Sequence, residues 1–555
     1  ASNLVWGDTN GTADIFVFDR LTRRVNRVSV SSRGAQGNGN HLYPSINTDG
    51  RYVAFISDSS NLVPGDTNGA ADVFVHDRQL RLTERVSITS SGVQANGDSY
   101  FPSISADGRY VSFSSDASNL VSGDTNKKAD VFVHDRWTRQ TTRVSVATTG
   151  VQGEGDHLFS CVSADGRFVA FASDSGNLVT GDTNGAPDVF VHDRQTRRTE
   201  RVSVSTDGVE GTGESVSPSI SADGRYVAFI STSKNLVEND TNNVADVFVY
   251  DREKGWTERV SVSTTGGQGG KDSHSPSISA DGRYVAFISE AANLTPGDTN
   301  GRADVFVCDR KSGRIQRVSD SRKGAAGNAD PAFPCINADG CCVAFVSGAD
   351  NLVPGDSNRA SDIFVSSTLP FKDISGHWAA GELRELADKE IIGGYPDGSF
   401  KPDNKITRVE AVSILTRVLD LDPGNGKELG FRDNNKIPAW AQGAVAAAVK
   451  EGLVEGYSRP DGTVVFNPDA TVSRAELAAL ISRIIKKKSG EVVPAVITFR
   501  DADKIPAWAK DAVGVAGAKG IITGYPDGTF RPQNGVTRAE VSAMVLRLLK
   551  WINGE

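Results

Sequence analysis

The sequence predicts a multidomain protein, with an all-β propeller of six to seven blades followed by a mainly α-helical bundle of three modules. Three observations lead to this fold class. The chain has 555 residues, which is too long for a single hydrophobic core. Residues 1–367 repeat strand-like runs at a period of 58 residues. A second repeat with alanine-rich, helical patterns then takes over and occurs three times.

The first repeat is marked by the stretch NLVxGDTN, which occurs seven times between Asn3 and Asn351 at intervals of 58 residues. Each period contains four short runs of the types PSIS, RYVAFIS, DVFVHD and TERVSVS, separated by Gly, Asn and Asp. The runs have the length and composition of strands, and no helical period precedes residue 370. Four antiparallel strands per period, repeated around an axis, predict propeller blades. A solenoid is the competing interpretation, although solenoid periods are usually shorter.

The arrangement SxDGRYVAFxS…DVFVHDR resembles the TolB-type, WD40-like propeller repeats of bacterial secreted and periplasmic proteins. This resemblance covers residues 1–367 and implies a fold rather than a function. No GxSxG, HExxH or phosphate-binding loop occurs, and His76, His134 and His192 merely occupy one repeat position. We therefore expect no catalysis in the propeller.

The strand count raises the question of how the ring closes. There are seven DVFV-type runs but only six each of the other three types. We expect Arg27–Val30 to supply the missing fourth strand of the last blade, Cys335–Ser367, and so to close six blades. The opening DIFVFD run is then surplus. It belongs to a seventh blade without inner strands, to a chain with an earlier start, or to a neighbouring subunit as a donated strand. The recurring Asp77 and Arg78 predict an ion pair between blades.

Every period also carries an acidic loop with Asp, Asn and Asp at positions i, i+2 and i+6. Oxygen ligands at this spacing suit a Ca²⁺ ion held in a turn, although the third acidic position and following Gly of a known calcium loop are absent. The alternative is that Asp and Asn cap the turn that leads into the DVFV strand. The candidate calcium ligands are Asp8, Asn10, Asp14, Asp66, Asn68, Asp72, Asp124, Asn126, Asp130, Asp182, Asn184, Asp188, Asp240, Asn242, Asp246, Asp298, Asn300, Asp304, Asp356, Asn358 and Asp362.

Composition excludes several classes of protein. The formal net charge of −9 disfavours nucleic-acid binding, and no apolar run is long enough to span a membrane. The chain has no leader, so we expect a mature secreted product whose targeting segment has been removed. Its five cysteines lack metal-site spacing and are expected to be free thiols, with a Cys335–Cys342 pair across a hairpin as the alternative. No cofactor is expected apart from the calcium ions considered above.

The second repeat has the pattern F-x-D…W-A…G-Y-x-D-G-x-F-x-P…T-R-x-E in three copies. Each copy predicts a helix after the Trp, a tight turn, and a second amphipathic helix. The pattern resembles the S-layer homology (SLH) module, with modules at residues 371–421, 430–485 and 498–552. This resemblance implies a pseudo-threefold bundle that binds secondary cell-wall polymer, often one capped by a pyruvylated, anionic amino sugar. It also implies a location at the cell surface, in the cell wall or S layer.

One arginine per module falls in the first turn of the second helix, where a guanidinium and the helix N-terminus suit a carboxylate. The S/T-x-x-E motifs around these arginines are also capping boxes, which require no ligand. The tryptophans either stack on sugar, with an aspartate nearby, or belong to the core. The second module has the longer turn GYSRPDGTVVF, which puts its groove in doubt. By resemblance, the candidate polymer-binding residues are Arg408, Arg474, Arg538, Trp378, Trp440, Trp508, Asp373, Asp433 and Asp501.

Together these features predict a non-catalytic structural protein of the cell surface or S layer, anchored non-covalently through the three C-terminal modules. The propeller then serves self-assembly, in a lattice or filament, or extracellular binding. The uniform register without loop insertions favours assembly, because functional sites usually occupy enlarged, unlike loops. The alternative is an anchored polysaccharide-binding protein or a glycan hydrolase or lyase that acts through the propeller.

Overall fold

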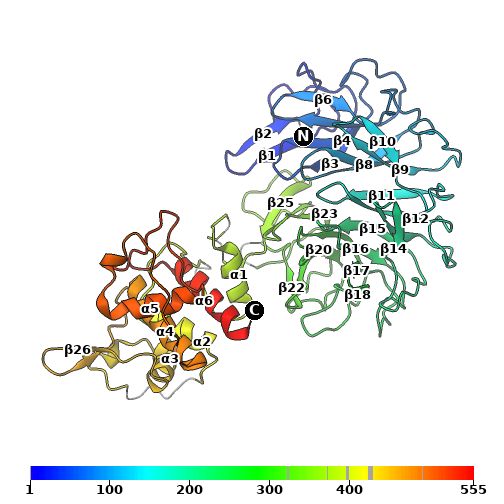
Figure 1. Ribbon diagram of the computed structural model, residues 1–555. Helices are drawn as coiled ribbons and strands as arrows, with labels where there is room; N and C mark the ends of the chain where they lie inside the picture. The colour runs from blue at the N-terminus through cyan, green and yellow to red at the C-terminus, as the bar shows by residue number, and fades with distance from the viewer. Residues whose placement is uncertain are drawn as a thin grey trace. The chain divides into compact units, whose positions relative to one another are not determined.

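The computed structural model describes residues 2–321, 324–371, 373–374, 376–395, 399–422, 429–490 and 492–554. The chain divides into two compact units, Ala1–Thr368 and Leu369–Glu555 (Figure 1). No helix in the described part of the chain combines the length and the apolar character needed to cross a membrane. None of the five cysteines forms a disulfide in these residues.

The first unit is a six-blade β-propeller, and its described residues contain no helix before residue 370. Five blades have four antiparallel strands and the sixth has three. Figure 1 shows these sheets side by side around a central axis. The blades are β3 (His41–Ile46), β4 (Tyr52–Ser57), β5 (Asp72–Asp77) and β6 (Leu82–Arg85); β7 (Ser99–Ile104), β8 (Tyr110–Ser115), β9 (Asp130–Asp135) and β10 (Gln140–Arg143); β11 (His157–Val162), β12 (Phe168–Ser173), β13 (Asp188–Asp193) and β14 (Arg198–Arg201); β15 (Ser215–Ile220), β16 (Tyr226–Ser231), β17 (Asp246–Asp251) and β18 (Trp256–Arg259); β19 (Ser273–Ile278), β20 (Tyr284–Ser289), β21 (Asp304–Asp309) and β22 (Arg314–Arg317); and β23 (Pro331–Ile336), β24 (Cys342–Ser347) and β25 (Asp362–Ser367).

The fourth strand of each complete blade ends at the arginine of the TERV-type run, earlier than the sequence predicts. In the first blade, the Ser87 hydroxyl accepts the N–H of Val73 and donates to the Asp72 carboxylate at 2.5 Å. The serine side chain therefore replaces a rung of the backbone ladder, and the chain leaves the sheet.

The blades pack through valine and phenylalanine side chains of the second and third strands. Val73 and Val75 of one blade pack against Val111 and Phe113 of the next, and all four are fully buried. The hairpin glycine at each ADG turn has the predicted positive φ, 75° at Gly108. Its lack of a side chain is also needed because the Tyr52 ring of the preceding blade occupies that space. The same small turn therefore shapes both the hairpin and the blade interface.

The predicted ion pair between blades is confirmed only for the arginine, at the equivalents of Arg78 in three later blades. Asp77 pairs with Arg51 of its own blade, at 2.7 Å between Nη2 and Oδ2. The arginine that follows this aspartate contacts the preceding blade instead, as Arg136 shows with Glu84 at 2.6 Å. Only the arginine therefore links blades.

The prediction that Arg27–Val30 completes the last blade is also wrong. A separate two-stranded sheet is formed by β1 (Phe16–Asp19) and β2 (Arg24–Arg27). Ile15 and Val28 beside it join the core around Val53 of the first blade. On its other side, Arg20 Nη1 lies 3.6 Å from Cys342 Sγ of the last blade. The β1–β2 sheet thus corresponds to the outer half of a further blade position, and in the described residues β25 forms a three-stranded sheet with β23 and β24.

The second unit contains six α-helices in its described residues, two for each module. They are α1 (Ala380–Asp388), α2 (Arg408–Val418), α3 (Ala439–Lys450), α4 (Arg474–Ser489), α5 (Ala507–Ala518) and α6 (Arg538–Asn553). Short elements accompany them: η1 (Asn434–Lys436), η2 (Ala502–Lys504), β26 (Tyr457–Ser458) and β27 (Val464–Val465). The second helix of each module packs against the first helix of the next, α2 on α3, α4 on α5 and α6 on α1. Residues 396–398, in the predicted turn of the first module, lie outside the described residues.

Candidate functional site

The three modules meet at a triangle of backbone hydrogen bonds. Ile406 donates to the carbonyl of Val536, Val536 donates to Val472, and Val472 donates to Ile406, at 2.9 to 3.2 Å. All three side chains are buried. Since each of these residues directly precedes the N-cap of a second helix, the triangle fixes where helices α2, α4 and α6 begin.

Each second helix begins with the predicted capping box. Thr407 with Glu410, Ser473 with Glu476, and Thr537 with Glu540 exchange side-chain and backbone hydrogen bonds. The residue after each N-cap is the predicted arginine. Arg408, Arg474 and Arg538 are 7%, 4% and 5% exposed, respectively. The caps therefore place a buried guanidinium at each helix N-terminus.

The guanidinium of Arg538, from the third module, makes three hydrogen bonds with the first module. Its Nη1 lies 2.7 Å from Glu410 Oε1, its Nε donates to the carbonyl of Phe400 at 2.8 Å, and its Nη2 donates to the carbonyl of Gly393 at 3.2 Å. It also lies over the rings of Phe400 and Tyr395, at 4.4 and 4.8 Å. This arginine has a structural role that its sequence position does not reveal.

Arg408 and Arg474 make fewer contacts with the following module. Arg408 donates through Nη1 to the Tyr457 hydroxyl at 2.9 Å and lies 4.5 Å over that ring. Arg474 donates through Nη2 to the carbonyl of Thr523 at 2.9 Å and lies 4.5 Å over the Tyr525 ring. In the described structure, the buried Nε of both arginines has no hydrogen-bond partner. The Nε of Arg408 and of Arg474 thus lacks an acceptor in the described structure, whereas the Nε of Arg538 is bonded to the carbonyl of Phe400.

The carboxylates and phenols beside the arginines have shifted pKa values, because they are partly buried and bonded to one another. Burial raises the pKa of Tyr457 to about 12, assisted by its hydrogen bond to Glu476 at 2.5 Å. Burial also acts to raise the pKa of Glu410, but hydrogen bonds from Thr407 and the charge of Arg538 outweigh it and hold that pKa below its ordinary value. Burial lowers the pKa of Arg474. Glu410 and Glu476, whose pKa values are lowered, are thus ionised at neutral pH, and the Tyr457 phenol is neutral.

Sequence reasoning missed the tyrosines and the capping-box glutamates as members of these grooves. Tyr395, Tyr457 and Tyr525 come from the Gly-Tyr turns, and each donates its hydroxyl to the capping-box glutamate of its own module. The recurrence of Gly-Tyr in all three copies was the available signal. The pattern suggests only a role for the tyrosine in the turn. In the structure, its ring also contacts the arginine of the preceding module.

The three candidate tryptophans, Trp378, Trp440 and Trp508, are each 60% exposed, so the alternative that they belong to the core is wrong. Trp440 lines a groove of about 400 Å³ together with Tyr395, Glu410 and Arg538. That groove combines residues of all three modules. An exposed indole beside a cation and a carboxylate offers a stacking surface together with polar contacts.

The candidate aspartates accept hydrogen bonds from backbone N–H groups of their own modules, and their role in polymer binding stays a prediction. Asp501 accepts the backbone N–H groups of Phe530 and Arg531 at 2.7 and 2.8 Å. Asp433 accepts two backbone N–H groups of its own module in the same way, and so does Asp373. These carboxylates fasten the turn that precedes the second helix, so their contacts are structural.

In the propeller, the acidic loops are occupied by arginine. Arg85 Nη1 lies 3.1 Å from Asp66 and 3.0 Å from Asp72, and five further copies hold an arginine in the same way. Asn68 accepts the N–H of Ala70 and donates to Asp72, which supports the turn-capping interpretation. Calcium binding stays a prediction. The copy in which the described residues provide no such arginine consists of Asp356, Asn358 and Asp362.

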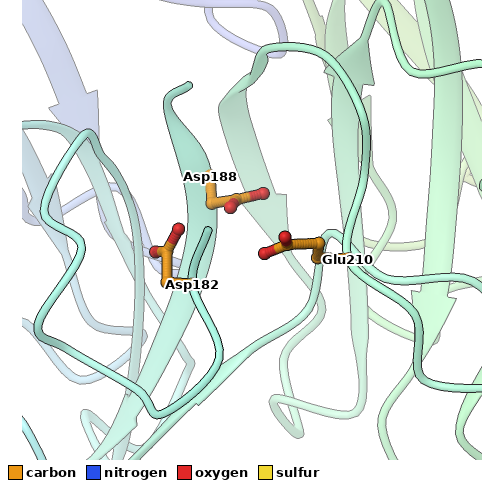
Figure 2. A group of neighbouring side chains, drawn as sticks. All are labelled: Asp182, Asp188 and Glu210. Atoms are coloured by element: carbon orange, nitrogen blue, oxygen red, sulfur yellow. The ribbon is translucent and has the colours of Figure 1, made fainter. Parts of the chain in front are cut away.

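One further carboxylate joins the loop in the third blade. Figure 2 shows Asp182, Asp188 and Glu210 turned toward one another, close enough to share a metal ion. Arg201 Nη1 lies 3.4, 3.1 and 2.7 Å from these three side chains. The guanidinium already pairs with all three carboxylates, so the geometry alone does not call for a metal.

Comparisons with known proteins concern mainly the second unit. A family model described as the S-layer homology domain matches residues 370–412, 430–478 and 498–542. The chain is 35% identical to a cellulosome-anchoring protein of Acetivibrio thermocellus, over 35% of this chain and 41% of that protein. It is 31% identical to S-layer protein EA1 of Bacillus anthracis, over 32% of this chain and 19% of that protein. The chain therefore spans less than half the length of these relatives.

Solved structures similar to this chain include TolB from Acinetobacter baumannii, with 17% identity and a TM-score of 0.33 over 54% of this chain and 58% of that one. An oligogalacturonate lyase has 14% identity and a TM-score of 0.41, over 64% of this chain and 83% of that one. These similarities are too low to support an argument about function. The three family matches indicate a location at the cell surface or cell wall, since S-layer homology domains bind cell-wall polymers. The protein thus carries a six-blade β-propeller followed by three S-layer homology domains.

Proposed function

We propose that this protein is a non-catalytic component of the bacterial cell surface, attached non-covalently by its C-terminal unit to an anionic secondary cell-wall polymer. The propeller serves assembly or extracellular binding. The observation that carries the proposal is the pair of buried guanidiniums, Arg408 and Arg474, whose Nε groups lack a partner in the described residues.

The chemistry of these grooves suits a sugar that bears a carboxylate, such as a pyruvate ketal. A guanidinium at a helix N-terminus combines a charged donor with the positive end of the helix dipole. Because burial strengthens a charge-assisted hydrogen bond, one carboxylate oxygen on Nε would satisfy a donor that is costly to leave unpaired. The exposed tryptophans add faces on which sugar rings stack. The Arg538 groove, whose guanidinium already bonds three acceptors of the first module, contributes contact surface rather than anion binding.

The test is co-sedimentation of the full chain with purified cell walls, with walls from which the secondary polymer has been extracted, and with walls treated with mild acid to remove ketal groups. We expect binding to intact walls alone. Arg408→Gln and Arg474→Gln should each weaken it roughly tenfold or more, by the loss of one charge-assisted hydrogen bond. Arg432→Gln removes an exposed arginine of the same unit and is the matched control. Equal binding to extracted walls would contradict the proposal.

An anchored glycan hydrolase or lyase is the second candidate. The chain is 26% identical to an amylopullulanase of Thermoanaerobacterium thermosulfurigenes over 50% of its length and 14% of that enzyme. Against catalysis stands the uniformity of the propeller, since an active site requires unlike residues at one point. Release of reducing sugars from wall or plant glycans by the purified chain would favour the enzyme, provided that a propeller carboxylate variant abolishes it.

A further inference from the structure

A glutamate–arginine ion pair recurs where neighbouring complete blades of the propeller meet. In each pair, the glutamate belongs to the fourth strand of one blade and the arginine directly follows the third strand of the next. One carboxylate oxygen lies on the arginine Nε. The pairs are Glu84 with Arg136, Glu200 with Arg252 and Glu258 with Arg310, at 2.6, 2.6 and 2.5 Å. Three of the four junctions between complete blades therefore place a carboxylate on the same nitrogen.

The fourth junction, between the second and third blades, has the arginine without the glutamate. Thr142 of β10 takes the glutamate position, and Arg194 follows β13. In the described part of the chain, no carboxylate lies within ion-pair distance of the Arg194 guanidinium. The charge of Asp135 reaches it, but that carboxylate pairs with Arg109 at 2.7 Å. This junction therefore has a cation whose usual partner is missing.

Arg194 is nevertheless held like its paired counterparts. Its side chain is half-buried, its Nη1 donates to the carbonyl of Gly166 at 2.6 Å, and its guanidinium lies 4.5 Å over the Tyr110 ring. Arg136 makes the same two contacts, with the hairpin glycine of its own blade and with a tyrosine of the preceding blade. The guanidinium is thus fixed in the position in which its counterparts receive a carboxylate.

A pocket of about 440 Å³ lies at this junction. Arg143, Arg194 and Arg197 line it together with Thr142 and His192, whereas no aspartate or glutamate is among its described lining residues. Arg143 already pairs with the acidic loop of its own blade, which leaves the other two arginines as the available cations. In a chain whose formal net charge is −9, this local positive charge selects an anion.

The pocket also contains neutral polar groups. His192 Nδ1 lies 2.8 Å from the Thr199 hydroxyl, which donates to the carbonyl of Val146 at 2.5 Å. Because the single hydroxyl proton is used in that bond, His192 donates from Nδ1, and its Nε2 is a hydrogen-bond acceptor. Burial lowers the pKa of His192 to about 4, so the ring is neutral at neutral pH. An acceptor beside a cation suits a ligand that carries hydroxyl groups as well as a carboxylate, and the volume is in the range of small-molecule sites.

We infer that this pocket binds an acidic sugar, such as a uronic acid residue, through a carboxylate on Arg194. The carboxylate takes the place that a glutamate side chain occupies at the three paired junctions, where charge-assisted hydrogen bonds are strongest. The sugar hydroxyls meet His192 and the threonine side of the pocket. This inference goes beyond the proposed wall anchor, because it gives the propeller a ligand of its own.

The test is a titration of the full chain with glucuronate, followed by saturation-transfer NMR, with glucose as the neutral analogue. The chain carries Arg408→Gln/Arg474→Gln, so that the grooves of the C-terminal unit do not contribute. We expect glucuronate to bind and glucose not to bind. Arg194→Gln should weaken binding tenfold or more, by the loss of a charge-assisted hydrogen bond. Thr142→Glu should abolish binding, because it restores the glutamate of the other junctions.

Arg139→Gln is the matched control. It removes an exposed arginine at the repeat position of Arg197 in the second blade, and it should bind glucuronate like the background chain. Thr142→Glu must keep the unfolding temperature of that chain, so that its loss of binding is not a loss of fold. Arg194→Gln in the otherwise unchanged protein should co-sediment with cell walls as the wild type does, so failure of this inference leaves the anchor untouched.

Four results would overturn the inference. Binding of glucuronate that survives both Arg194→Gln and Thr142→Glu would place the ligand elsewhere. Equal binding of glucose would show that the carboxylate is not recognised. Acetate that binds as tightly as glucuronate would reduce the site to a bare carboxylate site. A tetraglutamate peptide that binds more tightly than glucuronate would assign the pocket to an acidic protein partner.

Discussion

Arg538→Gln should destabilise the C-terminal unit more than Arg408→Gln does, whereas Arg408→Gln should weaken wall binding more. Arg538 donates three hydrogen bonds, one of them to Glu410, and the side chains of this ion pair are only 6% and 18% exposed. Removing one partner of a buried ion pair typically costs about 3–5 kcal/mol. Arg408 donates one side-chain hydrogen bond and lies over Tyr457, so its loss should cost about 1–2 kcal/mol.

Wall binding should follow the reverse order. The Nε of Arg408 is buried and lacks a partner in the described structure, and we propose that the polymer supplies one. Arg408→Gln should therefore lower the affinity for the polymer roughly 10- to 150-fold, the equivalent of one charged hydrogen bond. Arg538→Gln should lower it much less, once binding is measured on the folded fraction. Urea unfolding followed by amide hydrogen exchange in the C-terminal unit gives the first quantity, and co-sedimentation with cell walls gives the second. If both variants rank in the same order in both assays, the division between a structural and a ligand-binding arginine is incorrect.

Four further outcomes are expected. Trp440→Ala should weaken wall binding several-fold without lowering the unfolding temperature, because the indole is mostly exposed; a loss of stability would place it in the core. Asp501→Ala should destabilise the C-terminal unit by about 2–4 kcal/mol in urea unfolding, because two backbone N–H groups lose a charged acceptor. Burial raises the pKa of Asp130, Asp182 and Asp304 from the ordinary 3.8 to about 6. Between about pH 4 and 6 the folded state therefore binds more protons than the unfolded state, so the stabilisation from these groups grows as the pH falls through that window and is lost as it rises. Unfolding at pH 5 and 7 should show this trend, and Asp182→Asn should reduce it. Calorimetric titration should find no more than one calcium ion per chain, since a guanidinium lies between the paired aspartates in six copies.

Features encoded within one repeat could be predicted from the sequence. The blades follow from strand-length runs and glycine turns that lie within 58 residues of one another, and the capping boxes follow from four-residue motifs. These interactions are local, so a short window of sequence contains both partners. The propeller, predicted with six to seven blades, and the three S-layer homology domains are accordingly confirmed, with six blades in the structure.

Pairings between repeats could not be predicted in the same way. Arg538 contacts Glu410, 128 residues earlier, and no local pattern links the two. The pairing of β2 with β1, rather than with β25, depends on where the first and last blades lie around the ring, which no single repeat specifies. The arginine that pairs with each acidic loop could have been predicted from the sequence. Arg85 follows Asp72 by 13 residues, and this spacing recurs in the other periods. A search for a cation at a fixed distance from each loop would have found it.

The cyclic order of the arginine contacts has a consequence for truncated forms of the protein. Arg408 contacts the second module, Arg474 the third, and Arg538 the first. Three modules therefore make three complete arginine pockets, two consecutive modules make one, and a single module makes none. Shortening the anchor by a third should cost two thirds of its pockets, so attachment to the wall should fail as a step and not in proportion to length.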